Sequence, residues 1–329
     1  MLESQIRPNE LMQENARLRQ IDLRQLMEQK HQFVKVNCPA CQSRKVTKRW
    51  CKHGFKFVTC QECETVFISP RPTQTMLGKF YQQALSIKHW NDKIFPASEK
   101  DRREHIFKPR AKRLAELCQK YKIKHKLLVD VGAGFGTFGE EVKKLDLFDR
   151  IVMVEPSPDL ARTCRNKGLE VIEKTIEETR LTNVNAMTNF ELIEHLFSPK
   201  NFIQACARAL STGGLLILTT PNVRGFDLMT LGKVSDHIAG PNHLNYFHPR
   251  SLANLVEQCG LKVLEVTTPG KLDGEVVRNK IISGKYDASR NEFLLEILIN
   301  RWSDLDQPWQ NFLQRHNLSS HMWLVARKV

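Results

Sequence analysis

The chain has 329 residues, of which 41% are hydrophobic and 26% are charged. This composition excludes an intrinsically disordered chain, and the absence of any run of about 18 apolar residues excludes a membrane-spanning one. The length predicts about two domains, and the charged first 19 residues predict that no secretory signal is present.

Positive charge is concentrated in the first part of the chain. Lys and Arg number 50 against 36 Asp and Glu, a net charge of +14. Residues 1–125 contain 26 basic and 12 acidic side chains, and residues 126–329 contain 24 of each. The excess predicts a surface that faces an anionic partner such as phosphate, nucleic acid or a lipid headgroup. A basic surface that only improves solubility is an equally good interpretation.

Three segments precede the main domain. Residues 1–33 have mostly helical periodicity, and residues 34–72 contain short β-like runs that end at Ser69-Pro70-Arg71-Pro72, a tight turn typical of a domain boundary. Residues 73–125 are again helical and form a linker or lid. Their aromatic residues, from Phe80 to Phe95, are expected on a packed helix face, with a lid over a cofactor as the alternative.

Four of the nine cysteines have the spacing of a metal site. Cys38, Cys41, Cys60 and Cys63 form a C-x2-C-x18-C-x2-C pattern. Two such pairs complete a tetrahedral Zn²⁺ shell with no open position, so we predict a zinc ribbon with a structural Zn²⁺. The odd number of cysteines argues against a secreted disulfide framework and favours the reducing cytoplasm.

From residue 126 onward, strands alternate with helices, which predicts an α/β fold with a largely parallel sheet. A helical insertion is expected at about residues 269–318, with helices at Glu292–Trp302 and Trp309–Arg315. The seven predicted strands are Leu127–Val131, Ile151–Glu155, Glu170–Ile172, Ala186–Phe190, Gly214–Thr220, Leu261–Thr267 and His321–Arg327.

A glycine-rich turn follows the first of these strands. Gly132, Gly134 and Gly136 allow a sharp turn and a close approach to a ligand, and Glu155 ends the next strand, where it can bind ribose hydroxyls. The third glycine comes one residue too early for a dinucleotide fingerprint, and Asp130 precedes the loop. An acidic group there suits an ammonium group better than a pyrophosphate, which favours S-adenosylmethionine (SAM) over NAD.

These residues resemble the class I SAM-dependent methyltransferases. The segments that carry the resemblance are Leu128–Gly136, Val154-Glu155-Pro156-Ser157, Asn189–Leu196 and Gly213–Asn222. The resemblance implies a Rossmann-like sheet of seven strands, with His321–Arg327 as an antiparallel last strand. It also implies that Glu155 and Pro156 lie at the cofactor and that Glu191 holds the amino group of its methionine part.

Two further contacts with the cofactor are predicted. Thr175 and Ile176 follow the third strand, where the adenine would lie. Arg110 precedes the first strand and could pair with the cofactor carboxylate, because guanidinium groups bind carboxylates in a bidentate way. A surface arginine is an equally good interpretation of Arg110.

A narrower resemblance concerns the acceptor. The cysteine pattern and His243-Leu244-Asn245-Tyr246-Phe247 are similar to bacterial sugar C-methyltransferases and to methyltransferases associated with surface polysaccharides. Those enzymes have a Tyr-His-Glu-His-type run where this chain has Gly240-Pro241-Asn242-His243, and their large C-terminal domain is missing. The resemblance therefore implies methyl transfer more strongly than it implies a sugar carbon as the acceptor.

His195 and His243 are the candidate bases, since both are expected at the carboxyl edge of the sheet. For each of them, a structural histidine is the alternative. The sequence therefore predicts an enzyme that methylates an oxygen or carbon of a small or carbohydrate-linked acceptor. An RNA methyltransferase that uses the basic N-terminal segment is the main alternative, and a non-catalytic scaffold and an NAD-dependent enzyme are less favoured.

Overall fold

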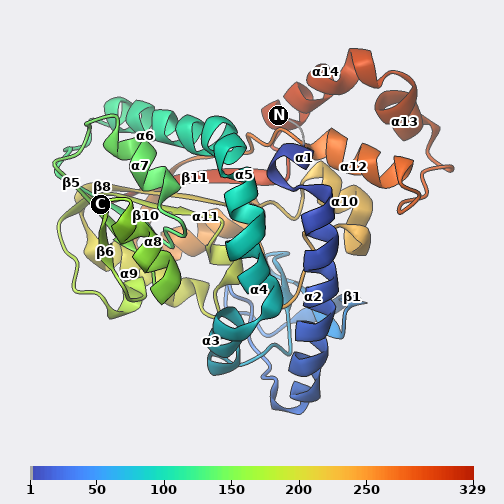
Figure 1. The fold of residues 1–329 in the computed structure, drawn as a ribbon, viewed down its shortest axis with the longest axis horizontal. Helices are drawn as coiled ribbons and strands as arrows, with labels where there is room; N and C mark the ends of the chain where they lie inside the picture. Colours follow the sequence, from blue (N-terminus) through green and yellow to red (C-terminus); the bar gives the residue numbers. More distant parts are fainter. Residues whose placement is uncertain (1–2) are drawn as a thin grey trace.

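A seven-stranded sheet forms the core of the second half of the chain. The computed structural model describes residues 3–329, and Figure 1 shows this sheet beside the N-terminal helices. The strand order is β10-β11-β8-β7-β4-β5-β6. The strands are β4 (Leu127–Val131), β5 (Arg150–Val154), β6 (Glu170–Ile172), β7 (Val184–Phe190), β8 (Leu210–Pro221), β10 (Leu261–Thr267) and β11 (His321–Lys328).

The direction of the strands agrees with the prediction. Strands β4 to β8 pair in parallel, whereas β11 is antiparallel to both β8 and β10. The antiparallel strand is the one expected at His321–Arg327. The α/β, Rossmann-like fold class with seven strands is thus confirmed. The main differences are at strand ends, because Val184 and Leu210 pair across an irregular register before the regular ladder begins at Ala186 and Leu215.

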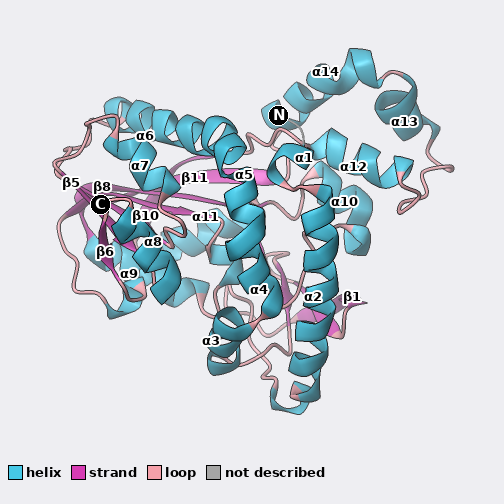
Figure 2. Ribbon diagram, viewed as in Figure 1, coloured by secondary structure: helices cyan, strands magenta, loops and turns pink. Residues whose placement is uncertain are grey.

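Helices cover both faces of the sheet (Figure 2). Alternate residues of a strand face opposite sides, and in β4 Leu128 packs in one hydrophobic layer while Val129 and Val131 pack in the other. This double burial explains the continuous apolar runs that made the strands recognisable in the sequence. The covering helices are α6 (Lys108–Lys120), α7 (Thr137–Lys143), α8 (Pro158–Asn166), α9 (Pro199–Ala209) and α11 (Pro249–Gln258).

The strand order reverses at β4. From β4 the chain moves outward through β5 to β6, then returns to β7 on the other side of β4. The loops that follow β4 and β7 therefore diverge, and open α/β sheets bind their ligands in the crevice at such a point. The glycine loop and the segment that contains His195 both lie at this edge of the sheet.

The cysteine module, residues 34–72, is joined to the large sheet domain through a shared strand. It contains β1 (Val46–Lys52), β2 (Phe55–Cys60) and β3 (Val66–Ile68), and its fourth strand is β9 (Asn245–Tyr246), from the loop after β8. Strands β3 and β9 are antiparallel. The sequence did not reveal this pairing, because two residues are too few to produce a periodic pattern.

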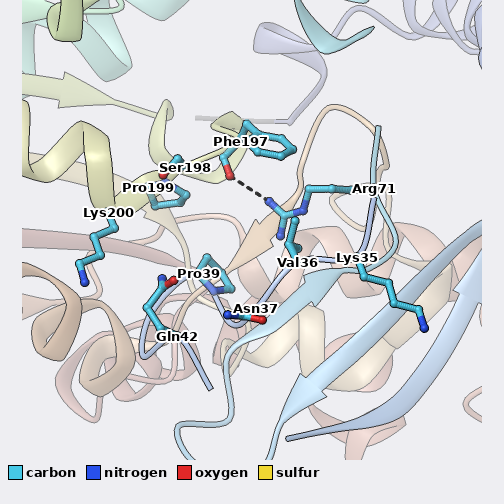
Figure 3. Close-up of a pocket in the computed structure, with 10 residues that line it drawn as sticks. All are labelled: Lys35, Val36, Asn37, Pro39, Gln42, Arg71, Phe197, Ser198, Pro199 and Lys200. Carbon is cyan, nitrogen blue, oxygen red and sulfur yellow. Dashed lines mark hydrogen bonds between the residues drawn. The ribbon is translucent and has the colours of Figure 1, made fainter. Parts of the chain in front are cut away.

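The buried side chain of Arg71 connects the cysteine module to the large sheet domain. Its side chain is almost fully buried and donates to the carbonyl oxygen of Ile68 at 3.0 Å, to that of Phe197 at 3.4 Å and to Asn245 Oδ1 at 3.1 Å. Figure 3 shows the bond to Phe197 beside a pocket between the module and the start of α9. Burial lowers the pKa of the Arg71 guanidinium to about 9, so it remains charged at neutral pH.

The N-terminal helices form a layer against the rest of the molecule. In Figure 1, α2 runs next to α4, and the Asp22 carboxylate of α2 accepts from the N–H groups of Leu85 and Ser86 at the start of α4. No helix among the described residues has both the length and the apolar character needed to cross a membrane. The helices are α1 (Glu3–Ile6), α2 (Asn9–Glu28), α3 (Gln74–Gln83), α4 (Leu85–His89) and α5 (Phe95–Arg102).

The segment expected as an insertion is helical and packs beside α10 (Phe226–Leu231). It contains α12 (Asp273–Ile282), which the sequence analysis missed, followed by α13 (Glu292–Leu295) and α14 (Trp302–Arg315). The last helix begins seven residues before the predicted Trp309 and continues through Pro308. The ring at Pro308 removes one helical hydrogen bond, and packing of the helix against its neighbours compensates for the loss.

We expect Arg71→Leu to lower the free energy of unfolding by about 3 kcal/mol, because the substitution leaves buried acceptors on Phe197 and Asn245 without a donor. Urea denaturation measures the loss. The exposed Arg44→Leu is the control, with a change within about 0.5 kcal/mol. Equal losses in the two variants would contradict this role of Arg71.

Candidate active site

The loop after β4 is held in a tight turn by its glycines. Gly132, Gly134 and Gly136 have φ angles of 72°, 57° and 70°, a region that glycine adopts without strain. A Cβ on Gly136 would lie 2.8 Å from Leu169 Cδ1. A Cβ on Gly134 would meet no heavy atom within 4 Å. Gly134 is therefore the place where a ligand can approach the backbone of this loop.

Glu155 directly joins the glycine loop to the end of β5. Its Oε2 accepts from the N–H of Gly134 at 2.8 Å, and its Oε1 accepts from the N–H of Ser157 at 2.9 Å. Burial raises the pKa of the Glu155 carboxyl, and the two N–H donors oppose that rise. Pro156 lies between Glu155 and Ser157. The structure thus brings together the two motifs that the sequence placed 19 residues apart.

Asp130, the last but one residue of β4, lies behind the loop. Its Oδ1 accepts from the hydroxyl of Thr188, on β7, at 2.6 Å. Burial raises the pKa of Asp130 to about 7, although the Thr188 hydroxyl and Arg110 lower it. A positively charged group bound next to Asp130 would favour its ionised form.

Thr175 and Ile176 lie on the other side of Glu155, after β6. Ile176 is buried in the large core, and Thr175 caps the short helical turn Ile176–Glu178 through Glu178. The N–H of Glu155 donates to the carbonyl oxygen of Ile172 at 3.1 Å, which fixes β6 next to the carboxylate. Thr175 is therefore exposed next to the end of β6, whereas the Ile176 side chain points into the core.

Arg110 enters the site from α6. Its Nη2 lies 3.5 Å from Glu191 Oε1 and 3.4 Å from Thr219 Oγ1, and its guanidinium stacks on Phe190. His321 Nδ1 lies 3.3 Å from the same Glu191 oxygen. Burial alone would raise the pKa of Glu191, but His321, Arg110 and the Thr219 hydroxyl hold it below its usual value. Arg110 is thus an internal cation and not a surface arginine.

The two predicted bases lie next to each other. The rings of His195, in the turn after β7, and His243, after β8, have centroids 4.9 Å apart. His195 Nδ1 lies 2.6 Å from the carbonyl oxygen of Asn242, and His243 Nδ1 lies 2.9 Å from that of His237. Burial lowers the pKa of both imidazoles, so both are neutral at pH 7.

The N-terminal helices reach this site. The Tyr81 hydroxyl of α3 lies 3.2 Å from His195 Nδ1 and donates to the carbonyl oxygen of Asn242 at 3.1 Å. Phe95 of α5 stacks on Phe135 of the glycine loop, with ring centroids 3.7 Å apart. The aromatic segment therefore serves as a packed helix face and at the same time covers the glycine loop.

The four paired cysteines converge as predicted. All four Sγ atoms lie within 4.8 Å of one another, with Cys38 and Cys63 3.4 Å apart and Cys41 and Cys60 3.5 Å apart. A hydrogen bond from the Cys38 thiol lowers the pKa of Cys63 to about 4, whereas the same bond raises the pKa of Cys38 and burial raises that of Cys41 to about 11. The four sulfur atoms could hold one tetrahedral metal ion.

The family comparison identifies the domain that carries this site. A family model described as a methyltransferase domain matches residues 98–266, slightly more than half of the chain. The chain belongs to this methyltransferase family. SAM is the methyl donor of this class, so the protein is a SAM-dependent methyltransferase and the prediction of an enzyme is confirmed.

The chain is also similar to individual methyltransferases. It is 27% identical over 220 residues to the ubiquinone biosynthesis O-methyltransferase of Xanthomonas oryzae, covering 59% of this chain and 87% of that protein. It is 28% identical to the probable SAM-dependent methyltransferase of Mycolicibacterium smegmatis, covering 40% and 46%. A crystal structure of a SAM-dependent methyltransferase from Clostridium acetobutylicum aligns with 73% of this chain and 98% of that chain, at 10% identity and a TM-score of 0.48.

Sequence reasoning missed four residues at this methyltransferase site. Glu194 lies inside the segment used for the resemblance. Its position between Glu191 and His195 was the available signal. Thr219 and His321 come from neighbouring strands, and Tyr81 comes from α3. Tyr81 and Thr219 lie in segments that the sequence analysis singled out, but no local pattern assigns them to this site, because only packing brings them and His321 to Glu191 and His195.

Proposed function

We propose that this methyltransferase moves the methyl group of SAM to an oxygen or carbon nucleophile of a small-molecule or carbohydrate-linked acceptor. One observation carries the proposal. The glycine loop and Glu155 are in direct contact on one side of the switch point, and two neutral imidazoles face each other on the other side. A donor site and a proton-accepting site therefore lie at the same edge of the sheet.

Glu155 and the glycine loop would hold the nucleoside part of the donor. Each carboxylate oxygen of Glu155 uses one lone pair on a backbone N–H and has another for a ribose hydroxyl. Gly134 leaves open space beside the loop, and Thr175 and Ile176 would lie against the adenine. Pro156 keeps the turn after Glu155 rigid through its fixed φ angle.

Charged residues near β4 and β7 would hold the amino-acid part. Arg110 supplies a buried guanidinium for the carboxylate, which is a strong, charge-assisted contact in a site of low dielectric constant. Asp130 and Glu191 supply carboxylates for the ammonium group. When bound, SAM supplies an electrophilic methyl group on a sulfonium.

His195 and His243 would prepare the acceptor. A backbone carbonyl only accepts hydrogen bonds, so a proton on Nδ1 of each ring leaves the lone pair on Nε2. The acceptor O–H gives its proton to Nε2 while its oxygen bonds to the methyl carbon and the carbon–sulfur bond breaks. Alignment of the two reactants supplies an effective concentration of about 10⁵ M or more.

Oxygen is the favoured acceptor atom. A relative that aligns with 87% of its own length is named as an O-methyltransferase. The basic residues of the N-terminal 125 suit an acceptor that carries phosphate, such as a nucleotide-linked sugar. RNA would suit the same charge, and the product analysis below separates the two classes.

The cysteine cluster is proposed to hold a structural Zn²⁺. Four thiolates fill a tetrahedral shell and leave no position for substrate. We place the reaction in the cytoplasm, because the odd number of cysteines argues against a secreted disulfide framework.

The acceptor class can be found by incubating the protein with methyl-labelled SAM and fractionated cell extract. Label in a small molecule or glycan supports the proposal. Label in RNA or DNA would instead identify a nucleic-acid methyltransferase. No label in any fraction would contradict both hypotheses.

We expect Glu155→Ala to weaken SAM binding by about 100-fold, because two hydrogen bonds to a charged acceptor are lost. Isothermal titration measures the affinity, and Glu257→Ala, at an exposed position on α11, is the control. Unchanged affinity in Glu155→Ala would remove this residue from the donor site.

We expect kcat/KM to rise with pH and to level off at an apparent pKa below 6.5. Burial lowers the pKa of His195, and the base must be unprotonated; Tyr81, Glu191, Glu194 and His243 are the titratable groups around it. His195→Gln should lower kcat about 100-fold or more and abolish the acid limb of the profile. The exposed His31→Gln should change neither, and a profile unchanged in His195→Gln would contradict the assignment.

We expect Cys38→Ser to release the zinc and to lower methyl transfer more than SAM binding. The glycine loop lies far from the cysteine module in the sequence. By contrast, β9 follows His243 directly and pairs with β3 of the module. Metal analysis, isothermal titration with SAM and turnover measure the three effects, and Cys51→Ser, outside the cluster, is the control. Equal metal content in wild type and Cys38→Ser would rule out the cluster as the zinc site.

A further inference from the structure

Glu194, His195 and His243 form a second cluster of metal-ligating side chains. One ligand atom from each lies within 4.8 Å of the others, and His195 Nε2 is 3.7 Å from Glu194 Oε1. The three residues come from the turn after β7 and the loop after β8. The cluster is therefore built from two separate segments and not from one run of acidic residues.

Both imidazoles are oriented as metal ligands are. The carbonyl oxygens of Asn242 and His237 accept from Nδ1 of His195 and His243, which leaves both Nε2 lone pairs directed away from those bonds. Histidines that bind metals nearly always donate their other ring N–H in this way. The Tyr81 hydroxyl adds a second contact that fixes the ring of His195.

The carboxylate of Glu194 has a buried oxygen without a partner. Oε2 accepts from the Thr220 hydroxyl at 2.8 Å, whereas Oε1 is buried and makes no hydrogen bond within the described residues. Burial and the nearby Glu191 raise the pKa of Glu194 well above its usual value. Because Oε1 lies 3.7 Å from His195 Nε2 and one ring nitrogen of His243 belongs to the same cluster, one bound cation could be shared by all three side chains.

We infer that Glu194, His195 and His243 bind a divalent first-row transition metal ion, and that a free position on this ion takes the acceptor hydroxyl. This inference rests on the proposed methyl transfer to oxygen. Two imidazoles and one carboxylate suit Zn²⁺, Mn²⁺, Fe²⁺ or Co²⁺, and three protein ligands leave room for substrate. Ligand atoms around such an ion are about 3.3 Å apart, so small side-chain rotations would bring the three ligand atoms to that spacing.

The ion would change how the acceptor loses its proton. A hydroxyl bound to a divalent cation ionises near neutral pH, and its proton passes to solvent water. The resulting oxygen bonds to the methyl carbon, and the carbon–sulfur bond breaks with its electron pair left on sulfur. In the loaded protein the two imidazoles act as ligands.

Cobalt spectroscopy separates the two metal sites. Purified protein, stripped of metal and titrated with Co²⁺, should bind two equivalents. The cysteine site gives an intense sulfur-to-cobalt band in the near ultraviolet, whereas the site of two nitrogens and one oxygen gives only weak visible absorption. Glu194→Gln, which keeps the shape but removes the charge, and the His195→Ala/His243→Ala double variant should each lose the second equivalent or bind it about 100-fold more weakly.

Matched variants make the result decisive. Cys38→Ser should lose the near-ultraviolet band, and the exposed His31→Ala should keep both bands. SAM affinity, measured on the same samples, should be unchanged in Glu194→Gln. A second equivalent that survives in Glu194→Gln and in the double histidine variant, or wild-type protein that binds Co²⁺ only at the cysteines, would overturn the inference. Loss of SAM binding in wild type would instead overturn the proposed function.

Discussion

Two backbone hydrogen bonds of Leu244 hold the acceptor side of this methyltransferase together. Its N–H donates to the carbonyl oxygen of Glu194 at 2.8 Å, and its carbonyl accepts from Ile68 of β3 at 2.9 Å. Leu244 therefore lies between the turn after β7 and the cysteine module, and the neighbouring His243 is positioned by both. Because buried backbone groups need partners, movement of the module away from the domain would leave these groups unsatisfied. The cysteine module is thus joined through backbone hydrogen bonds to the segments that carry the two proposed bases.

Part of the positive charge of residues 1–125 is used for contacts inside the molecule. Arg71 lies in the junction, Arg110 enters the site, and Arg103 pairs with Glu99, Glu140 and Glu141 across α5 and α7. These arginines were counted in the predicted basic surface, yet they hold elements together. The remaining exposed lysines and arginines make up the basic surface of this part of the chain. A net charge therefore overstates the basic surface when arginines are used as buried donors.

The sheet and the donor side were predictable because their signals are local. Leu127–Val131 is buried on both faces and reads as an apolar strand, and the positive φ angles of the loop that follows it require glycine. Glu155 could be found because its distance from the loop in sequence matches one strand–helix–strand unit. The acceptor side lacks such signals. Glu194 and Tyr81 meet at His195 through tertiary packing, and β9 is too short to be periodic.

The donor side and the proposed acceptor side of the enzyme are held by different kinds of contact. The donor side consists of loops after β4, β5 and β6, which are fixed by the hydrogen bonds of the parallel sheet. The acceptor side is formed where α3, the cysteine module and the loop after β8 meet, and the contacts there are between side chains and single backbone groups. Substitutions in those segments can reshape the acceptor side without disturbing Glu155 or the glycine loop. The same sheet can thus serve different acceptors, because specificity depends on contacts that the donor site does not use.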